Sequence, residues 1–321
     1  MTALTPEGEC QDIGFGEWDM DKYIQSERHH DHNRRPCHVP FTYQGETFQT
    51  YYKIIGDLDN RTRTPVVVVH GGPGLAHDYL IPHTDLSSHS FPVILYDQVG
   101  NARSTHLSDA QAPLLSVEFF VEELVNVLEH FGIQDEYHIV GHSWGGMLAA
   151  ELIVRRRARG LKRLVIADSP ADIALWGKSF KELLEPFPQS VKDAIAKGEA
   201  ADRQGWWDAM MVFYAQHGCR VQPFPEEFIT TFAYSHGENA DQTVAKSGVT
   251  RGWSIVDRVH EIDVPTLVIN GRHDVAQDYV TEAYIKKIPG AKWIKFEESS
   301  HMPFWEERGK YMEAVAGFLG E

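Results

Sequence analysis

Short apolar runs alternate with segments of helical period along most of the chain. Runs this short, without polar alternation, are typical of strands buried on both faces of a sheet. Because buried strands that alternate with helices form parallel sheets, the sequence predicts an α/β fold with a mostly parallel sheet covered on both faces. The predicted strands are Val66–Val69, Val93–Tyr96, Tyr137–Val140, Leu164–Ala167, Thr266–Ile269 and Lys292–Phe296.

Two further local signals predict a hairpin and a helix. Residues 38–55 have the pattern of an antiparallel hairpin, with Gln44 and Gly45 at its turn. Farther along, apolar residues recur at helical spacing, with Ser116 placed to cap the first turn and Gly132 after the last apolar position. We therefore expect an amphipathic helix between these two residues.

The alternation of strands and helices stops between about residues 170 and 261, where the composition is helical and rich in aromatic residues. We interpret residues 171–261 as a helical lid inserted into an α/β core made of residues 36–170 and 262–321. Most of the aromatic side chains then form the core of the lid, and a few face the site that it covers. Residues 1–35 are polar without strong periodicity, and we expect an N-terminal arm there.

Composition is typical of a globular protein and narrows the range of partners. Hydrophobic residues make up 42% and charged residues 24% of the chain, and the net charge is −16. Because nucleic-acid binding needs a basic surface, we expect no nucleic-acid partner. Three cysteines are too few for a disulfide framework, and the sequence has neither a secretory signal nor a membrane-length apolar stretch. We expect a cytoplasmic protein with reduced thiols and no membrane association.

The segment from Arg28 to His38 holds histidines at positions 29, 30, 32 and 38. A metal site is one interpretation, but nothing in the spacing fixes a coordination geometry. We prefer a solvated polar segment, and we expect neither a metal nor another cofactor.

The pentapeptide Gly141–Gly145 carries the most specific chemical signal, the pattern Gly-x-Ser-x-Gly around Ser143. A predicted strand runs into it and a predicted helix leaves it at Trp144, an arrangement that lifts a serine hydroxyl out of the sheet on a sharp turn. The glycines allow the close backbone approach that such a turn needs. We interpret Ser143 as a nucleophile; the alternative is a tight glycine turn that happens to contain a serine.

An acid and a base follow Ser143 in the chain order of an α/β-hydrolase triad. Asp274 and His301 each come just after a predicted strand. The carboxyl ends of parallel strands are where open α/β sheets place their ligands. Because a serine hydroxyl needs a base to take its proton, we expect His301 to be that base and Asp274 to orient it. Asp168, which follows another predicted strand, is the alternative acid.

A glycine-rich loop, His70–Gly74, follows the first predicted strand. Tetrahedral intermediates need backbone N–H donors aimed at the oxyanion, and we expect these from Gly72 and from Trp144, the residue after the nucleophile. A phosphate-binding loop is the competing interpretation, but the Gly-Lys-Ser/Thr that it requires does not follow. We expect His70 to brace the loop rather than to take part in chemistry.

Short motifs that occur together in one known family run through roughly residues 40–320: His70–Gly74, His77–Leu80, Asp97–Gln98 with Gly100 and Ser104, Gly141–Gly146, Phe213–Tyr214, Cys219–Arg220, Trp253–Arg258, Gly271–Asp274 and Ser299–Met302. The chain thus resembles the proline iminopeptidases and their relatives within the α/β-hydrolases. The resemblance implies a triad of Ser143, Asp274 and His301 with oxyanion donors at Gly72 and Trp144. It also implies release of an N-terminal residue, often proline, from small peptides, amides or arylamides without a metal.

The chain departs from the family pattern at two places. Ala102 replaces the second glycine of the loop that follows the Asp-Gln motif. In the lid, peptidase members carry a Gly-Pro-Asn/Ser-Glu-Phe segment whose glutamate is thought to hold the free amine of the substrate. The corresponding position here falls near Thr243, and Asp241 or Glu238 would substitute for the glutamate if the lid loop is shifted.

Three functions are compatible with these features. The first is hydrolysis of a small amide or peptide bond, such as release of an N-terminal residue, through an acyl-enzyme. The second is hydrolysis of an ester, lactone or amide that lacks a free amine, because the amine anchor differs from the family pattern. The third, a ligand-binding protein without turnover, conflicts with an intact triad. In each case we expect a small molecule or short peptide as partner, and the sequence does not set the oligomeric state.

Overall fold

The computed structural model describes residues 2–4, 10–12, 37–237 and 240–321, with side chains from residue 37 onward. The first two segments pair as short antiparallel strands, β1 (Thr2–Leu4) and β2 (Cys10–Asp12). Most of the predicted N-terminal arm lies outside the described residues, and so do the histidines at positions 29, 30 and 32.

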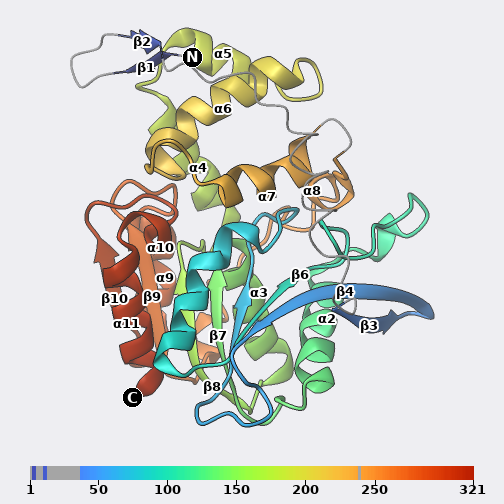
Figure 1. Ribbon diagram of the computed structural model, residues 1–321. Coiled ribbons are helices and arrows are strands. Elements are labelled where there is room, and N and C mark those ends of the chain that lie inside the picture. The colour runs from blue at the N-terminus through green and yellow to red at the C-terminus, as the bar shows by residue number, and fades with distance from the viewer. Residues whose placement is uncertain (1, 5–9, 13–36, 238–239) are drawn as a thin grey trace.

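An eight-stranded sheet with strand order β10-β9-β8-β7-β5-β6-β4-β3 forms the centre of the fold (Figure 1). The six strands from β10 to β6 are parallel, and β4 pairs antiparallel with both β6 and β3. This confirms the predicted α/β class with a mostly parallel sheet. The strands are β3 (His38–Tyr43), β4 (Glu46–Ile55), β5 (Val66–Val69), β6 (Val93–Asp97), β7 (Tyr137–His142), β8 (Leu161–Ala167), β9 (Thr266–Gly271) and β10 (Lys292–Phe296).

The predicted hairpin is confirmed as the antiparallel edge of this sheet. Strands β3 and β4 meet at the pair Tyr43 and Glu46. The two residues between them, Gln44 and Gly45, have φ values of 49° and 86°. Positive φ at both central residues is the condition for the two-residue turns whose twist matches that of paired strands. The Gln-Gly dipeptide therefore closes the hairpin because glycine tolerates this conformation without steric cost.

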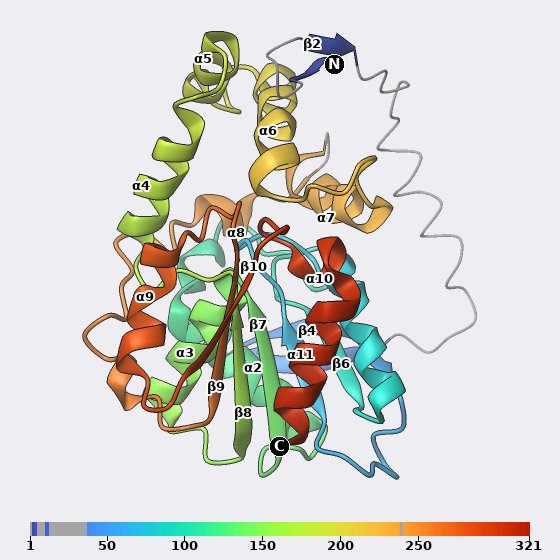
Figure 2. The same ribbon diagram turned by 90° about the vertical axis from the view of Figure 1, so that its left-hand side faces the viewer.

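Both faces of the sheet are buried, which explains why its strands read as continuous apolar runs. Along β5, Val67 and Val69 enter one hydrophobic cluster and Val66 and Val68 enter another. The first cluster includes side chains of α2 (Val117–His130), α3 (Trp144–Arg156) and α9 (Asp278–Lys287). The second includes side chains of the 3₁₀ helix η1 (Asp78–His89) and of α11 (Arg308–Gly320). The helices thus form a layer on each face (Figure 2).

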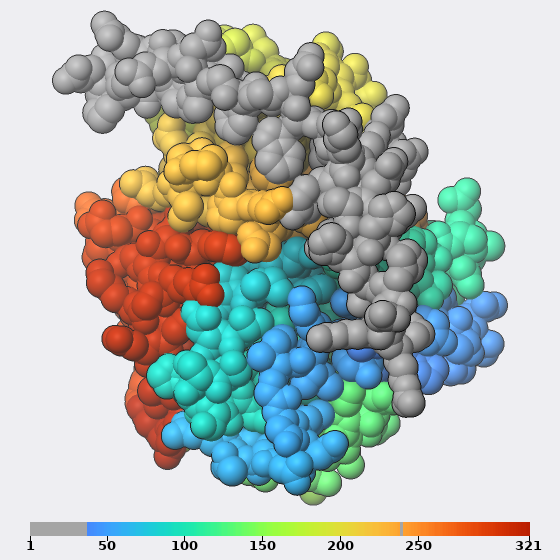
Figure 3. Space-filling view, in the orientation of Figure 1, coloured from blue at the N-terminus to red at the C-terminus, as the bar shows by residue number. Residues whose placement is uncertain are grey.

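The α-helices between β8 and β9 lie over the carboxyl ends of the central strands (Figures 1 and 3). They are α4 (Ile173–Leu184), α5 (Gln189–Lys197), α6 (Arg203–His217), α7 (Glu226–His236) and the short α8 (Thr243–Lys246). Phe187 and Phe213 form a small third cluster there with Val275, which follows β9, and Trp176 and Phe180 pack against it. We therefore propose that residues 171–261 form a lid over this edge of the sheet.

The two ends of this insertion are joined side by side. Asp172 and Ser254 form an antiparallel bridge, the N–H of Ile173 donates to the carbonyl of Trp253 at 3.0 Å, and the N–H of Ile255 donates to the carbonyl of Ala171 at 3.0 Å. The chain therefore leaves the core and returns to it at one place. The remaining short helices are η2 (Ala112–Leu114), η3 (Val259–Glu261) and α10 (Pro303–Glu306).

Across the described residues, every helix is too short or too polar to cross a membrane.

The helix predicted after Ser116 begins with the expected cap. Ser116 has extended backbone angles, and its Oγ accepts the N–H of Phe119 at 3.1 Å. The helix it starts buries Phe119, Phe120 and Leu124 against the sheet.

Replacing this cap should weaken the fold measurably. Ser116→Ala leaves the Phe119 N–H without its acceptor and should lower the free energy of unfolding in urea by about 1 kcal/mol. Ser116→Asp, which keeps a side-chain acceptor, should lose much less. Equal losses in the two variants would contradict the capping role.

Candidate active site

Ser143 stands on a sharp turn between β7 and α3. Its φ of 54° and ψ of −121° are sparsely populated for a residue with a side chain, and such strain is typical of a nucleophile elbow. The neighbouring glycines are sterically required. A Cβ on Gly145 would lie 2.1 Å from the carbonyl oxygen of Val69, and one on Gly141 would lie 2.5 Å from that of Gly145. The Gly-x-Ser-x-Gly pattern is thus explained by backbone contact between β5, β7 and α3.

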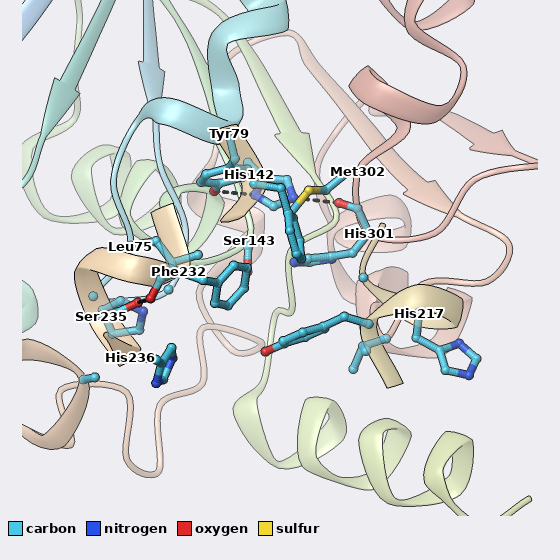
Figure 4. Close-up of a pocket in the computed structure, with 18 of the residues that line it drawn as sticks. Leu75, Tyr79, His142, Ser143, His217, Phe232, Ser235, His236, His301 and Met302 are labelled. Atoms are coloured by element: carbon cyan, nitrogen blue, oxygen red, sulfur yellow. Dashed lines mark hydrogen bonds between the residues drawn. The ribbon is translucent and has the colours of Figure 1, made fainter. Parts of the chain in front are cut away.

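Asp274 and His301 meet in the structure. Asp274 follows β9 and is fully buried, and its Oδ1 accepts the Nδ1–H of His301 at 2.7 Å. With Nδ1 as the donor, the other ring nitrogen of His301 is left unprotonated on the neutral ring. His301 and Ser143 line the same pocket (Figure 4). Asp168, the alternative acid, instead accepts the N–H of Gly271 through its Oδ1 at 3.1 Å.

His70 braces the glycine-rich loop from inside. Its Nε2 accepts the N–H of Gln98 at 3.0 Å, and its Nδ1 donates to the carbonyl of Gly71 at 2.9 Å. Burial lowers the pKa of His70 to about 4, so the ring is neutral at pH 7 and each nitrogen has one fixed role. Gly72 follows in this loop with φ 112° and lines the pocket.

The side chain of Trp144 points away from the pocket. Its Nε1–H donates to Oε1 of Gln98 at 2.8 Å, and its ring packs edge-on against Phe120 with centroids 5.8 Å apart. Any part that Trp144 plays at an oxyanion therefore belongs to its backbone N–H.

A buried hydrogen-bond chain that the sequence analysis did not predict joins the three loops of the site. The hydroxyl of Tyr79 accepts the N–H of Gly71 at 2.7 Å and donates to Nδ1 of His142 at 2.8 Å. Nε2–H of His142 in turn donates to the carbonyl of His301 at 2.8 Å (Figure 4). Burial raises the pKa of Tyr79 and lowers that of His142, so both groups stay neutral and the direction of each bond is fixed. In the sequence, this chain is indicated only by Tyr79, which lies in the His77–Leu80 motif, and by His142, which lies next to Ser143.

The pocket beside Ser143 has a volume of about 220 Å³ and a mostly apolar wall. Helices of the proposed lid supply much of that wall through Trp176, Tyr214, Phe228 and Phe232. Within the described part of the chain, no carboxylate lines the pocket. The polar residues in the wall, besides Ser143 and tyrosines, are the histidines 142, 217, 236 and 301 and Ser235.

Of the residues predicted to hold a substrate amine, the two that the structure describes are not in this wall. Glu238 lies outside the described residues. Asp241 faces His106, with its Oδ2 2.8 Å from Nδ1, and its Oδ1 accepts the N–H of Thr243 at 2.8 Å. Neither Asp241 nor Thr243 is among the lining residues, whereas the nearby Ala245 is.

A different carboxylate, that of Glu199, contacts a residue of the pocket wall from behind. His236 lines the pocket, and its Nδ1 lies 3.1 Å from Oε1 of Glu199. The amide of Gln242 donates to the same oxygen at 2.6 Å and so holds Glu199 in place. This pair, which the sequence analysis missed, puts a hydrogen-bonded histidine where a polar substrate group would meet the lid.

Two groups of described side chains bring potential metal ligands within 4.8 Å of one another: Asp168, Asp274 and His301, and His77, Asp78 and Asp97. In each group a histidine Nδ1 lies 2.7 Å from a carboxylate oxygen. Two ligands of a tetrahedral zinc ion, each about 2.0–2.2 Å from the metal, lie about 3.3 Å apart. Both groups therefore fit hydrogen-bonded clusters better than metal sites.

Comparison with known proteins agrees with this geometry. Residues 64–308 match the family profile of the alpha/beta hydrolase fold. The proline iminopeptidase of Clostridioides difficile is 30% identical over 283 residues, which cover 85% of this chain and 94% of that protein. The chain belongs to the proline iminopeptidase-like family of α/β-hydrolases. It is therefore an enzyme of the α/β-hydrolase superfamily, and the resemblance inferred from its motifs is confirmed.

A second relative and two solved structures are also similar to this chain. The proline iminopeptidase of Thermoplasma volcanium is 31% identical over 278 residues, 84% of this chain and 92% of that protein. The structure of a proline iminopeptidase from Mycobacterium smegmatis superposes with a TM-score of 0.76 at 33% identity, covering 88% of this chain and 97% of that one. The structure of VinJ superposes with a TM-score of 0.81 at 35% identity, covering 88% and 98%.

The Tyr79 hydroxyl should matter both for the fold and for the site of this family member. Tyr79→Phe leaves the Gly71 N–H and Nδ1 of His142 without partners in a buried region, which should cost about 1–3 kcal/mol in urea unfolding. Because the bond to Gly71 adjoins Gly72, labelling of Ser143 by a fluorophosphonate should also slow.

Tyr311→Phe provides the matched control, since it removes another buried tyrosine hydroxyl, bonded to His83 at 3.1 Å and outside the pocket wall. It should cost stability without slowing the labelling. Equal labelling rates in the two variants would show that Tyr79 has only a structural role.

Proposed function

We propose that this enzyme is a metal-independent serine hydrolase that cleaves small amide or peptide bonds through an acyl-enzyme on Ser143. The observation that carries the proposal is the 2.7 Å hydrogen bond between the buried Asp274 and His301, whose ring lines the same pocket as Ser143. Membership in a family of proline iminopeptidases suggests release of an N-terminal residue or of an amino-acid amide.

The chemistry follows from the roles of these groups. The free ring nitrogen of His301 takes the proton of Ser143 Oγ as that oxygen attacks the acyl carbon, and Asp274 stabilises the imidazolium that forms. The N–H groups of Gly72 and Trp144 bind the oxyanion. The C–N bond then breaks as His301 returns its proton to the leaving amine. A water molecule, deprotonated by His301, releases the acid and restores Ser143.

The wall of the pocket suggests which acyl groups fit. A volume of about 220 Å³ lined by the lid aromatics suits one compact apolar residue. A free ammonium buried without a carboxylate partner is costly. Since the described lining holds no carboxylate, a second candidate function is hydrolysis of an ester, lactone or amide that lacks a free amine.

The nucleophile is tested by a single substitution. Ser143→Ala should lower turnover of small amides and esters by several orders of magnitude and abolish fluorophosphonate labelling, while leaving the unfolding transition in place. Chelators should leave the wild-type rate unchanged, because no metal takes part. Full activity in the variant, or loss in EDTA that zinc restores, would refute the mechanism.

The need for a free amine is tested with one substrate pair, a prolyl arylamide and its N-acetyl form. We expect acetylation to lower kcat/KM by less than about tenfold, because a charge-assisted hydrogen bond of roughly 1.5–3 kcal/mol is missing from the described wall. Asp241→Asn, Glu238→Gln and Glu199→Gln identify any anchor. A preference of more than about tenfold for the free amine that disappears in one of these variants would make that residue the anchor.

A further inference from the structure

Two buried carboxyl groups lie side by side behind the proposed base. Asp168 follows β8, Asp274 follows β9, and both side chains are fully buried. One oxygen of each carboxyl and a ring nitrogen of His301 all lie within 4.8 Å of one another. Two charged carboxylates that are buried away from water and lie this close together repel each other strongly. One of them is therefore expected to hold a proton.

Hydrogen-bond accounting leads to the same conclusion. Oδ1 of Asp274 accepts from His301 at 2.7 Å, and Oδ1 of Asp168 accepts from the N–H of Gly271 at 3.1 Å. Among the described residues, neither Asp168 Oδ2 nor Asp274 Oδ2 has a donor. Buried polar atoms are nearly always paired. The two carboxyl groups lie close enough for a hydrogen bond between them, so one shared proton would give both carboxyls a partner.

We propose that Asp168 is a protonated carboxylic acid that donates to Oδ2 of Asp274 and so orients the carboxylate that faces His301. The proton belongs on Asp168, because Asp274 faces the ring of His301. In the proposed mechanism that ring becomes positive when it takes the proton of Ser143, and a negative carboxylate on Asp274 stabilises it. Asp168 is thus a positioning residue, which acts through Asp274 and does not touch the substrate.

The surroundings of Asp168 agree with a neutral acid. Burial, and then the charge of Asp274 and the hydrogen bond between the two groups, raise the pKa of Asp168 well above its ordinary value. Besides Asp274 and His301, which belong to the same cluster, the titratable groups that interact with Asp168 are Glu306 on α10, Tyr79 on η1 and Tyr311 on α11. Glu306 adds negative charge and the buried tyrosines are neutral, so none of them stabilises a second carboxylate.

The backbone at this position provides a matched pair of variants. Asp168 has a φ of 52°, in the left-handed region that asparagine and glycine adopt readily. Asp168→Asn keeps a donor for Asp274, and Asp168→Gly removes it while tolerating the same φ.

The first test uses catalysis and rests on the proposed function. The rate of fluorophosphonate labelling of Ser143 and kcat for a small amide or ester should stay within about threefold of wild type in Asp168→Asn. Both should fall by about tenfold or more in Asp168→Gly, because a misaligned catalytic group loses this much. Wild-type rates in Asp168→Gly, or an equal fall in both variants, would overturn the proposal.

The second test needs no activity. In the unfolded chain an aspartate has a pKa of about 3.9. If the pKa of Asp168 is higher in the folded protein, its proton stabilises the fold. This stabilisation is complete below about pH 3.9 and is lost as the pH rises toward the pKa of the folded state. Asparagine has no such proton. The Tm of Asp168→Asn minus that of wild type should therefore increase as the pH rises above about 4. A difference that does not change with pH would show that Asp168 is ionised and would overturn the proposal. Should wild-type Ser143 resist labelling, the proposed function fails, and this measurement still decides the state of Asp168.

Discussion

The chain of hydrogen bonds from the Gly71 N–H through Tyr79 and His142 to the carbonyl of His301 holds the site together. Its members come from the loop after β5, from η1, from the last residue of β7 and from the loop after β10, which the parallel sheet brings to one edge. The sheet fixes where those loops begin, but it does not fix the relative positions of their backbones. The chain does so, because the bonds from Tyr79 to His142 and from His142 to His301 each join two different segments. A loop can shift only if a buried donor or acceptor loses its partner.

Burial gives these polar groups definite proton positions. His70 and His142 are both kept neutral, so each ring has one donor and one acceptor, and its neighbours determine which nitrogen is which. In water the same rings would exchange tautomers and rotate. Under our proposals, Asp168 and Asp274 follow the same rule, with one proton between two carboxyls. In the proposed mechanism, these neutral groups surround His301, the histidine whose charge changes when it takes the proton of Ser143.

Much of the fold and part of the site could be predicted from the sequence, for local reasons. The strands were evident because both faces are buried, and Ser116 because capping depends on neighbouring residues alone. Asp274 and His301 were found from chain order and strand ends, and the structure brings them into contact. Their catalytic roles and that of Ser143 remain proposals.

What the sequence did not reveal depends on contacts between distant segments. Asp241 faces His106, from which it is separated by 135 residues, and Glu199 meets His236 from another part of the insertion. Tyr79 likewise meets His142 across 63 residues. No periodicity or spacing encodes such contacts, because they depend on how the loops are packed in three dimensions.

The bridge between Asp172 and Ser254 has a consequence for how this family diversifies. Because the insertion leaves and rejoins the core at adjacent points, its length and helices can change without altering the register of β8 and β9. The helices that cover the pocket can therefore differ in length and sequence while the strands and the turn at Ser143 beneath them keep their positions. The same property makes this chain a suitable scaffold for engineering, in which residues 171–261 are replaced to change the wall of the pocket while the turn at Ser143 is kept.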